Sequence, residues 1–403
     1  MTKILNTEIN LSFLVNPFYL YCIAFSFSIL IYMLGWSKLY PPLSIGLILF
    51  MVISFVLFIL VFKLFENRFA IKIKYYHNWK QNLHIVDLFF SLIIALGILN
   101  VALMGYIPVF DRSMNYLDFG IPVLDPIFNS MSIFFSVFFF QIYLESKKKR
   151  FFIYILVFLV LNLLIFRRSS VIWIITSIVF VYILYRPKVR ILYIFILILC
   201  MPFFTFTFGL YGSKRSNLTK SYVINELEAS DNFKKTGFNY NNYLTYLYIS
   251  SPLANLQKNI NESNGIFNKK EYLDFFLYNL VPQSITIRLE KLLDLSSPEC
   301  YLIHPHLIVG TFLMISFYTL GWVGMISMLV FLLFFIILSL TIIRKWNIFG
   351  ISTFCLLSTT VCLLIFSNFL NRLDVILMLL VYPVLFHVIF NIERKLNRVV
   401  KFE

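Results

Sequence analysis

Charged residues are scarce in this sequence. They make up 13% of its 403 residues, about half of the roughly 25% that soluble globular domains carry. The five cysteines form no CxxC pair and no HExxH motif is present, so no metal or redox motif is evident. Only Cys300 lies outside the apolar runs, so no disulfide framework is implied. The alternating pattern of membrane β-strands is also absent.

Hydrophobic residues, in contrast, make up 60% of the chain. They gather in runs of roughly 17–25 residues, the length that an α-helix needs to cross a bilayer core about 30 Å thick. The sequence therefore predicts an all-α, polytopic integral membrane protein. About ten transmembrane helices meet this length criterion, at residues 16–35, 42–62, 84–104, 121–144, two within 151–185, 191–210, 320–342, 349–367 and 375–390.

Two long apolar stretches need to be divided. At 1.5 Å per residue, residues 151–185 would form a helix about 52 Å long, too long for one crossing. Because both ends are basic and Arg167-Arg168-Ser169-Ser170 interrupts the stretch, we predict a hairpin of two spans. Residues 306–340 are also too long for one span and contain several glycines, so a short re-entrant or interfacial piece to Thr319 is expected before the next span.

The net charge of +15 follows the predicted topology. Lysines and arginines in the short connections collect mainly on one side, which the positive-inside rule makes cytoplasmic. Both termini are then cytoplasmic, and nucleic-acid binding is not needed to explain the charge. The predicted domains are residues 1–210 with spans 1–7, 211–306 as a long extracytoplasmic loop with short helices between spans 7 and 8, 307–391 with the re-entrant piece and spans 8–10, and 392–403 as a cytoplasmic tail.

Three arginines depart from this charge pattern, because they lie at tight turns on the predicted outer side: Arg167, Arg168 and Arg372. Arginine near hydrocarbon is costly and often marks a ligand or a pathway. Its planar guanidinium matches phosphate oxygens, so we predict a site for a lipid-linked diphosphate. Arg215, just past span 7, could join that site. The alternative is that these side chains reach lipid headgroups without any specific ligand.

Other candidate residues lie within the predicted loop. Histidines can take up or release a proton near neutral pH, which makes His304 and His306 candidates where the chain returns to the membrane. Arg288 is either a further candidate or an ordinary surface ion pair with Glu290 or Asp294.

Two tyrosines of the loop, Tyr243 and Tyr246, share a helical face. Their rings could stack on sugars, or they could belong to an interfacial aromatic belt. Both interpretations remain open at this stage.

The order of these features resembles a known superfamily. Many spans, an arginine-bearing hairpin, a long outer loop and the return stretch from His306 to Gly324 resemble the O-antigen polymerase (Wzy-type) and O-antigen ligase superfamily. The segment YLYISSPLANLQ, residues 246–257, looks more like the polymerase branch. The resemblance covers most of the chain.

The resemblance implies a polymerase of undecaprenyl-diphosphate-linked oligosaccharide repeat units in a bacterial inner membrane. Such an enzyme transfers the growing glycan to another lipid-linked unit on the outer face, without a metal or other cofactor. The arginines would neutralise the departing diphosphate, and His306, with His304 second, would be the base. Membrane lipids and a chain-length regulator protein are the implied partners.

Three other functions remain open on the sequence alone. A ligase of the same superfamily would differ only in its acceptor. A flippase or other transporter of lipid-linked oligosaccharide would often show two similar halves, which we do not find here. A metal-dependent transferase with a polyprenyl monophosphate donor would resemble proteins with an acidic first outer loop, whereas this loop, WSKLYPP from Trp36, has no acid.

Overall fold

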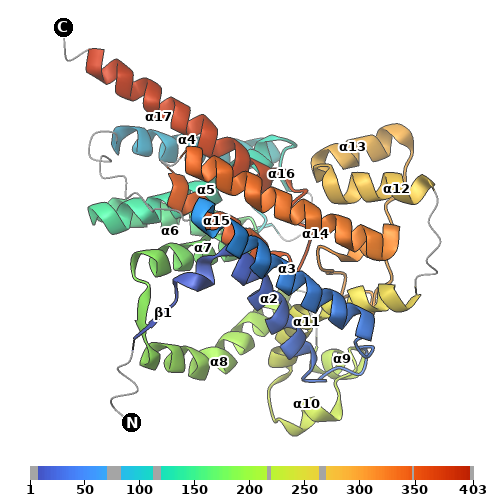
Figure 1. Cartoon of the computed structure of the whole chain (residues 1–403). Helices are drawn as coiled ribbons and strands as arrows, with labels where there is room; N and C mark the ends of the chain where they lie inside the picture. Colours follow the sequence, from blue (N-terminus) through green and yellow to red (C-terminus); the bar gives the residue numbers. More distant parts are fainter. Residues whose placement is uncertain are drawn as a thin grey trace. The chain divides into compact units, whose positions relative to one another are not determined.

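The computed structural model describes residues 8–69, 83–111, 119–215, 219–262, 269–346 and 349–399. Part of the basic segment after span 2 and the end of the C-terminal tail lie outside these residues. The chain forms two compact units, each built from separate stretches and composed mainly of helices (Figure 1). Unit 1 comprises Met1–Leu64, Arg186–Leu333 and Val361–Asn371, and unit 2 comprises Phe65–Tyr185, Phe334–Thr360 and Arg372–Glu403.

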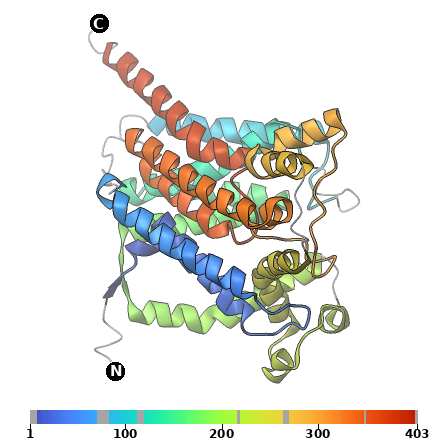
Figure 2. The ribbon, with the colours of Figure 1, turned by 45° about the vertical axis from the view of Figure 1, so that its right-hand side comes forward.

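Unit 1 is built around long helices joined by short ones. The long helices are α2 (Pro17–Tyr32), most of α3 (Ile45–Phe69), α8 (Ile191–Arg215), α11 (Tyr240–Glu262) and the first part of α14 (Met314–Lys345). The short elements are η1 (Ser12–Val15), α9 (Lys220–Asn225), α10 (Asp231–Lys235), α12 (Lys269–Phe275), η4 (Phe276–Leu280) and α13 (Gln283–Leu293). Two short strands, β1 (Glu8–Asn10) and β2 (Lys188–Arg190), pair antiparallel before α8 (Figure 2), a small departure from the predicted all-α fold.

Unit 2 is organised around helix α5 (Leu124–Ser146). The other helices are α4 (Leu83–Met104), α6 (Lys149–Leu164), α7 (Arg168–Tyr185), the end of α14, most of α15 (Gly350–Leu363), α16 (Leu373–Ile376), the π-helical segment η6 (Leu377–Val381) and α17 (Tyr382–Val399). Helix α5 contacts α4, α6 and α7. Its phenylalanines, such as Phe135 and Phe138, are fully buried, so α5 forms the core of this unit.

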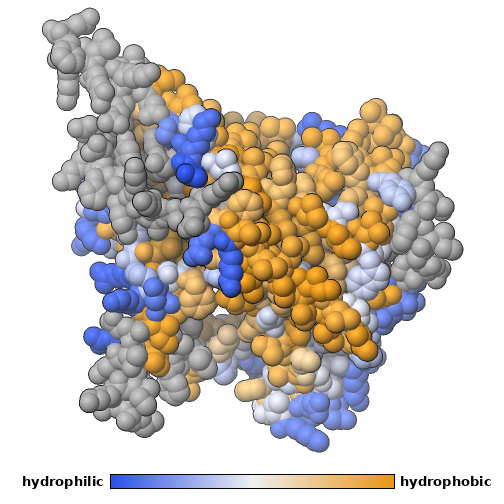
Figure 3. All heavy atoms as spheres, viewed as in Figure 1, coloured by the Kyte–Doolittle hydropathy of each residue, from blue (hydrophilic) through white to orange (hydrophobic). Residues whose placement is uncertain are grey.

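Six described helices are long and apolar enough to cross a membrane: Ile45–Glu66, Leu83–Met104, Leu124–Ser146, Arg168–Tyr185, Met314–Lys345 and Leu373–Phe390. Apolar side chains gather on the face seen in Figure 3, where α3 and α14 expose residues such as Ile53 and Val330 at 65% and 59%. A surface of this kind is unfavourable in water and suits hydrocarbon. The chain is a polytopic α-helical membrane protein, and the larger number of about ten spans remains a prediction.

Both divided stretches break where the sequence indicated. The predicted break is confirmed, because α6 ends at Leu164 and α7 begins at Arg168. That each of these helices crosses the membrane remains a prediction. In α14 the helical dihedral angles are lost at Leu320 and Gly321, where φ of the glycine is +57°. Only glycine adopts that conformation without strain, so the return piece ends one residue after the predicted boundary.

The predicted loop at 211–306 is in part wrong. Helix α8 continues to Arg215, and α11 is a helix of 23 residues with most of its side chains buried against α2 and α8. Its polar side chains have partners: Asn242 donates to the carbonyl oxygen of Pro202 at 3.0 Å, and Thr245 donates to that of Thr205 at 2.6 Å. Polar residues that suggested a hydrated loop therefore satisfy hydrogen bonds inside unit 1.

The contact between α8 and α11 predicts an effect of glycine substitution. A Cβ on Gly209 would lie 1.8 Å from the backbone oxygen of Asn241. We expect Gly209→Ala to destabilise the protein by about 1–3 kcal/mol, as overpacking does, measured by thermal unfolding in detergent. Gly212→Ala on the same helix is the matched control, because its Cβ meets nothing within 4 Å. Equal melting temperatures for the two variants would contradict this packing.

Candidate functional site

Arg167, predicted as a phosphate ligand, is paired with a carboxylate inside unit 2. Its Nη2 donates to Oδ1 of Asp125, and the two side chains are 15% and 21% exposed. Asn100 also donates to this carboxylate at 2.7 Å and accepts the backbone N–H of Ile121. A Cβ on Gly120 would lie 2.4 Å from Cγ of Asp125, so the space beside the carboxylate requires a glycine. The pair joins the start of α5 to the α6–α7 connection.

Arg372, at the other predicted outer turn, has a carboxylate partner of its own. Its Nε and Nη2 donate to Oδ1 and Oδ2 of Asp374, at 3.0 and 2.5 Å. This is the two-pronged geometry in which guanidinium and carboxylate bind most strongly. The carboxylate also accepts the backbone N–H of Val375 at 3.0 Å, so Asp374 is held at the start of α16.

One amide on α5 connects the two pairs. Asn129 lies one helical turn after Asp125 and is buried. Its Nδ2 donates to Oδ2 of Asp374 at 2.9 Å, and its Oδ1 accepts the hydroxyl of Ser170 at 2.5 Å. Because Ser170 is three residues after Arg167, both predicted outer turns are tied to the same face of α5. We call the side chains that form this network the arginine cluster: Asn100, Asp125, Asn129, Arg167, Ser170, Arg372 and Asp374.

The π-helical segment η6 explains why Asp374 and Tyr382 both face α5. In a regular α-helix, Asp374 and Tyr382 would be rotated by about 80° from each other, since each residue adds about 100°. A π turn accommodates one extra residue, which reduces the offset to about 20°. Both side chains then reach α5, where Tyr382 hydrogen-bonds with Ser130 at 2.7 Å, one residue after Asn129. Such turns often occur at functional sites.

The arginine cluster leaves one strong donor unused. Nη1 of Arg167 is buried and has no hydrogen-bond partner among the described residues. An unsatisfied donor in a buried site costs about 1–3 kcal/mol, more when it is charged. Arg168, the next residue, adds a further guanidinium at the start of α7. An oxyanion would satisfy the unused donor of Arg167.

The four predicted phosphate ligands therefore do not all lie in the same unit. Arg167 and Arg372 are joined by the network in unit 2, and Arg168 opens α7 beside them with a half-buried side chain. Arg215 is the last residue of α8 in unit 1, and its side chain lies outside the described residues. Its membership of a phosphate site remains a prediction.

The predicted bases, His304 and His306, lie in a turn of unit 1. Their rings are stacked with centroids 5.5 Å apart, and His306 is exposed, with its ring edge against Tyr222 at 5.6 Å. Helix α11 fixes this turn, because the side-chain amide of Asn255 hydrogen-bonds with the backbone at Ile303, Leu307 and Val309. The turn is thus well ordered, and its catalytic role remains a prediction.

The environment of His304 predicts that the stability of the protein depends on pH. Burial lowers the pKa of His304, and the charge of His306 lowers it further, while Glu226 and Glu228 act in the opposite direction. The unfolded chain therefore binds a proton more readily than the folded one. Stability should be fully present above the ordinary histidine pKa of about 6.5 and decline as the pH falls below it. We expect this decline, measured by thermal unfolding from pH 8 to 5, to be smaller in His304→Gln, and an unchanged profile would contradict the assignment.

Arg288 does not belong to the arginine cluster. It lies on α13 in unit 1, is exposed, and makes no ion pair among the described residues. The surface ion pair with Glu290 or Asp294 that the sequence allowed is not formed. A catalytic role for Arg288 remains a prediction.

Tyr243 is a core residue, which corrects its interpretation as a sugar-stacking side chain. It has no exposed surface and packs in a cluster with Val223, Leu227 and Phe233. Its hydroxyl donates to the backbone oxygen of Leu227 at 2.6 Å. A ring enclosed on both faces cannot stack on a glycan, so Tyr243 stabilises unit 1 instead.

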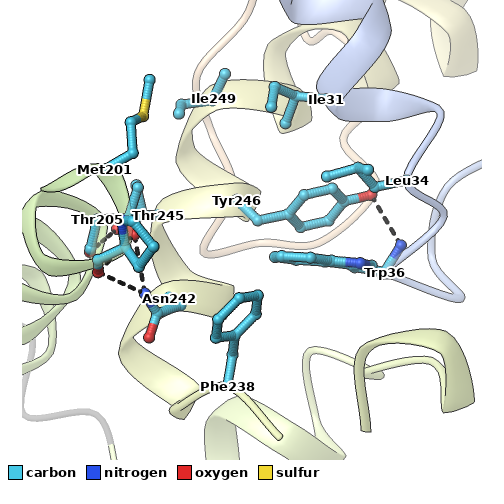
Figure 4. Close-up of a pocket in the computed structure, with 11 residues that line it drawn as sticks. Ile31, Leu34, Trp36, Met201, Thr205, Phe238, Asn242, Thr245, Tyr246 and Ile249 are labelled. Atoms are coloured by element: carbon cyan, nitrogen blue, oxygen red, sulfur yellow. Dashed lines mark hydrogen bonds between the residues drawn. The ribbon is translucent and has the colours of Figure 1, made fainter. Parts of the chain in front are cut away.

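Tyr246 has a different position, since its ring lines a pocket of about 240 Å³ in unit 1 (Figure 4). Its hydroxyl accepts the backbone N–H of Trp36 at 3.3 Å, and the two rings lie 5.2 Å apart. Phe238 and Asn242 also line the pocket, whose remaining lining is mainly aliphatic. Such a site can hold an apolar group of modest size, and a contact between Tyr246 and a glycan remains a prediction.

Five of the seven side chains in the arginine cluster were not candidates in the sequence analysis. Asp125, Asn129 and Asp374 were read as parts of apolar spans or their edges, although a carboxylate or amide within a span is itself a functional signal. The spacing of Asp125 and Asn129, which places them on one helical face, could have identified them. Trp36 was considered only as part of a loop without an acid.

Fold and site together define a membrane-embedded helical protein with a partly buried cluster of arginines and carboxylates. Among the residues that the structure describes, no group of three or more His, Cys, Asp or Glu side chains is arranged to hold a metal ion. No protein-family model, no curated protein and no solved structure matched the chain in the comparisons.

Proposed function

We propose that this protein is a polymerase of undecaprenyl-diphosphate-linked oligosaccharide repeat units, acting on the outer face of a bacterial inner membrane. The observation that carries the proposal is the buried Nη1 of Arg167, which has no hydrogen-bond partner among the residues that the structure describes. A lipid-linked diphosphate combines the two properties that this site favours, since its chain belongs in the membrane and its head is an anion. The resemblance in sequence supports the same reaction.

In the proposed reaction, a hydroxyl of the acceptor sugar attacks the anomeric carbon of the donor glycan. A new carbon–oxygen bond forms, the bond to the phosphate oxygen breaks, and the diphosphate leaves with the electron pair. Arg167 and Arg372 would hold the diphosphate and stabilise the charge that develops on it. Guanidinium groups suit this role because they stay protonated and bind phosphate oxygens through two donors.

The proton of the attacking hydroxyl must go to a base. Lowering of its pKa by burial keeps His304 neutral at neutral pH, the form that can accept a proton. His306, the first choice from the sequence, is exposed. Both histidines are retained as candidates, and no metal or other cofactor is part of the proposal.

A product ladder tests this function. The full-length protein in liposomes would receive a synthetic lipid-diphosphate repeat unit in the presence of a chelator. The expected result is a series of products that differ by one repeat unit. If no ladder forms with any of the repeat units that are tested, the polymerase proposal is wrong.

Two alternatives give other outcomes in the same assay. A ligase would form product only after its own acceptor is added, because it differs from the polymerase in that substrate alone. A transporter would move lipid-linked glycan across the bilayer without extending it. One observation favours the transporter as the second candidate: α5 buries a series of polar side chains along the core of unit 2, Ser130, Ser132, Ser136 and Gln141, and polar residues within spans often mark a pathway.

A further inference from the structure

The arginine cluster consists of two halves that come from different parts of the chain. One half is Arg167 with Asp125, and the other is Arg372 with Asp374. Each guanidinium is oriented by its own carboxylate. Among the described contacts of these four side chains, the link between the halves is Asn129, which binds Asp374 directly and the start of α7 through Ser170.

Asparagine suits this place chemically. Its amide is donor and acceptor at once, and here the donor serves the carboxylate while the acceptor serves the serine hydroxyl. The side chain is 7% exposed, so water cannot replace either partner easily. Aspartate at position 129 would place two carboxylates against each other, and leucine would leave the carboxylate of Asp374 without one of its donors.

We propose that Asn129 is a specificity-determining positioning residue: it holds the Arg372 half in register with the Arg167 half, so that the site selects a lipid diphosphate over a lipid monophosphate. This rests on the proposed function. A monophosphate can bind one guanidinium, whereas a diphosphate gains from two that are held at a fixed separation. The two anchor points on α5, Asp125 and Asn129, are one turn or about 6 Å apart along the helix axis, which keeps the halves close together.

A positioning role for Asn129 predicts different effects on the affinities for the monophosphate and the diphosphate. A purely structural role predicts the same effect on both. Loss of the Asn129 amide leaves the hydrogen bond between Arg167 and Asp125 in place, since Asn129 takes no part in it. Monophosphate binding should therefore be retained, while the second contact of a diphosphate is lost. A general loss of packing would weaken both ligands together.

The test measures equilibrium binding of a short-chain polyprenyl diphosphate and the matching monophosphate to the purified full-length protein in nanodiscs. In Asn129→Leu, we expect the preference for the diphosphate to fall at least about tenfold, the value of one hydrogen bond to a charged group. Affinity for the monophosphate should stay within about twofold.

The controls keep the outcomes distinct. Ser136→Ala removes a buried hydroxyl of α5 whose partner among the described residues is the carbonyl of Ser132, and it should keep the wild-type preference. If Asn129→Leu does not fold, Ser170→Ala removes one partner of the same amide and should lower the preference to a smaller extent. An unchanged preference in the folded variant overturns this inference alone, whereas a wild-type protein without any preference for the diphosphate overturns the proposed function.

Discussion

Replacement of Arg167 by glutamine is expected to lower the rate of repeat-unit polymerisation by about 100- to 1,000-fold, the usual effect of removing one preorganised donor to a developing negative charge. Glutamine keeps a polar side chain next to Asp125 but removes the positive charge and the buried Nη1 donor. The diphosphate would then leave from a site with one positive charge fewer. The measurement is the rate of ladder formation in liposomes at saturating substrate.

Lys148→Gln is the matched control for this prediction. It also removes one positive charge from unit 2, but its side chain is exposed and lies just before α6, on the predicted cytoplasmic side. Its effect on the rate should stay within about twofold. If Arg167→Gln polymerised as fast as this control, the arginine would be a structural residue and the proposed diphosphate site would lose its main support.

Replacement of Asp374 by alanine is expected to destabilise the protein by about 3 kcal/mol, because removing one partner of a buried ion pair leaves the other charge uncompensated. The carboxylate is 8% exposed and accepts hydrogen bonds from Arg372, Asn129 and Val375. The arginine is 32% exposed, so water can partly replace its lost partner, and the value lies at the lower end of the usual range. Thermal unfolding in detergent would show the loss as a melting temperature lower by several degrees.

Asp231→Ala provides the comparison for an exposed ion pair. Asp231 lies 3.9 Å from the amines of both Lys38 and Lys234, and its side chain is 72% exposed. Exposed pairs contribute little to stability, so this variant should melt close to the wild type. A melting temperature of Asp374→Ala equal to that of Asp231→Ala would show that the arginine cluster does not stabilise unit 2.

The arginines of the site could be identified from sequence because they violate a strong rule. A cation at a tight outer turn is unfavourable near hydrocarbon, so Arg167 and Arg372 stood out without any knowledge of the fold. Their partners did not, since a single Asp125 or Asp374 at the edge of an apolar run looks like an ordinary helix end. Only the packing of α5 against α7 and α16 brings these four side chains into one network.

The predicted loop illustrates the opposite difficulty. Helix boundaries in apolar stretches could be predicted closely, because span length and glycine positions determine them: α4 at Leu83–Met104 was expected at 84–104. Helix α11 could not be predicted in this way, because its polar residues suggest a hydrated loop in the sequence and are in fact buried with hydrogen-bond partners. Tyr243 was misread for the same reason, because periodicity places a side chain on a face but does not say what covers that face.

The most direct test of the account is to locate the bound diphosphate in the chain. A polyprenyl diphosphate with a photoreactive group next to the phosphates would be crosslinked to the full-length protein, and the labelled peptides identified by mass spectrometry. We expect labelling of peptides that contain the α6–α7 connection around Arg167 or the turn at Arg372, suppressed by unlabelled diphosphate. Labelling confined to peptides of unit 1, such as those of α11 or the His304 turn, would contradict an arginine-held diphosphate in unit 2.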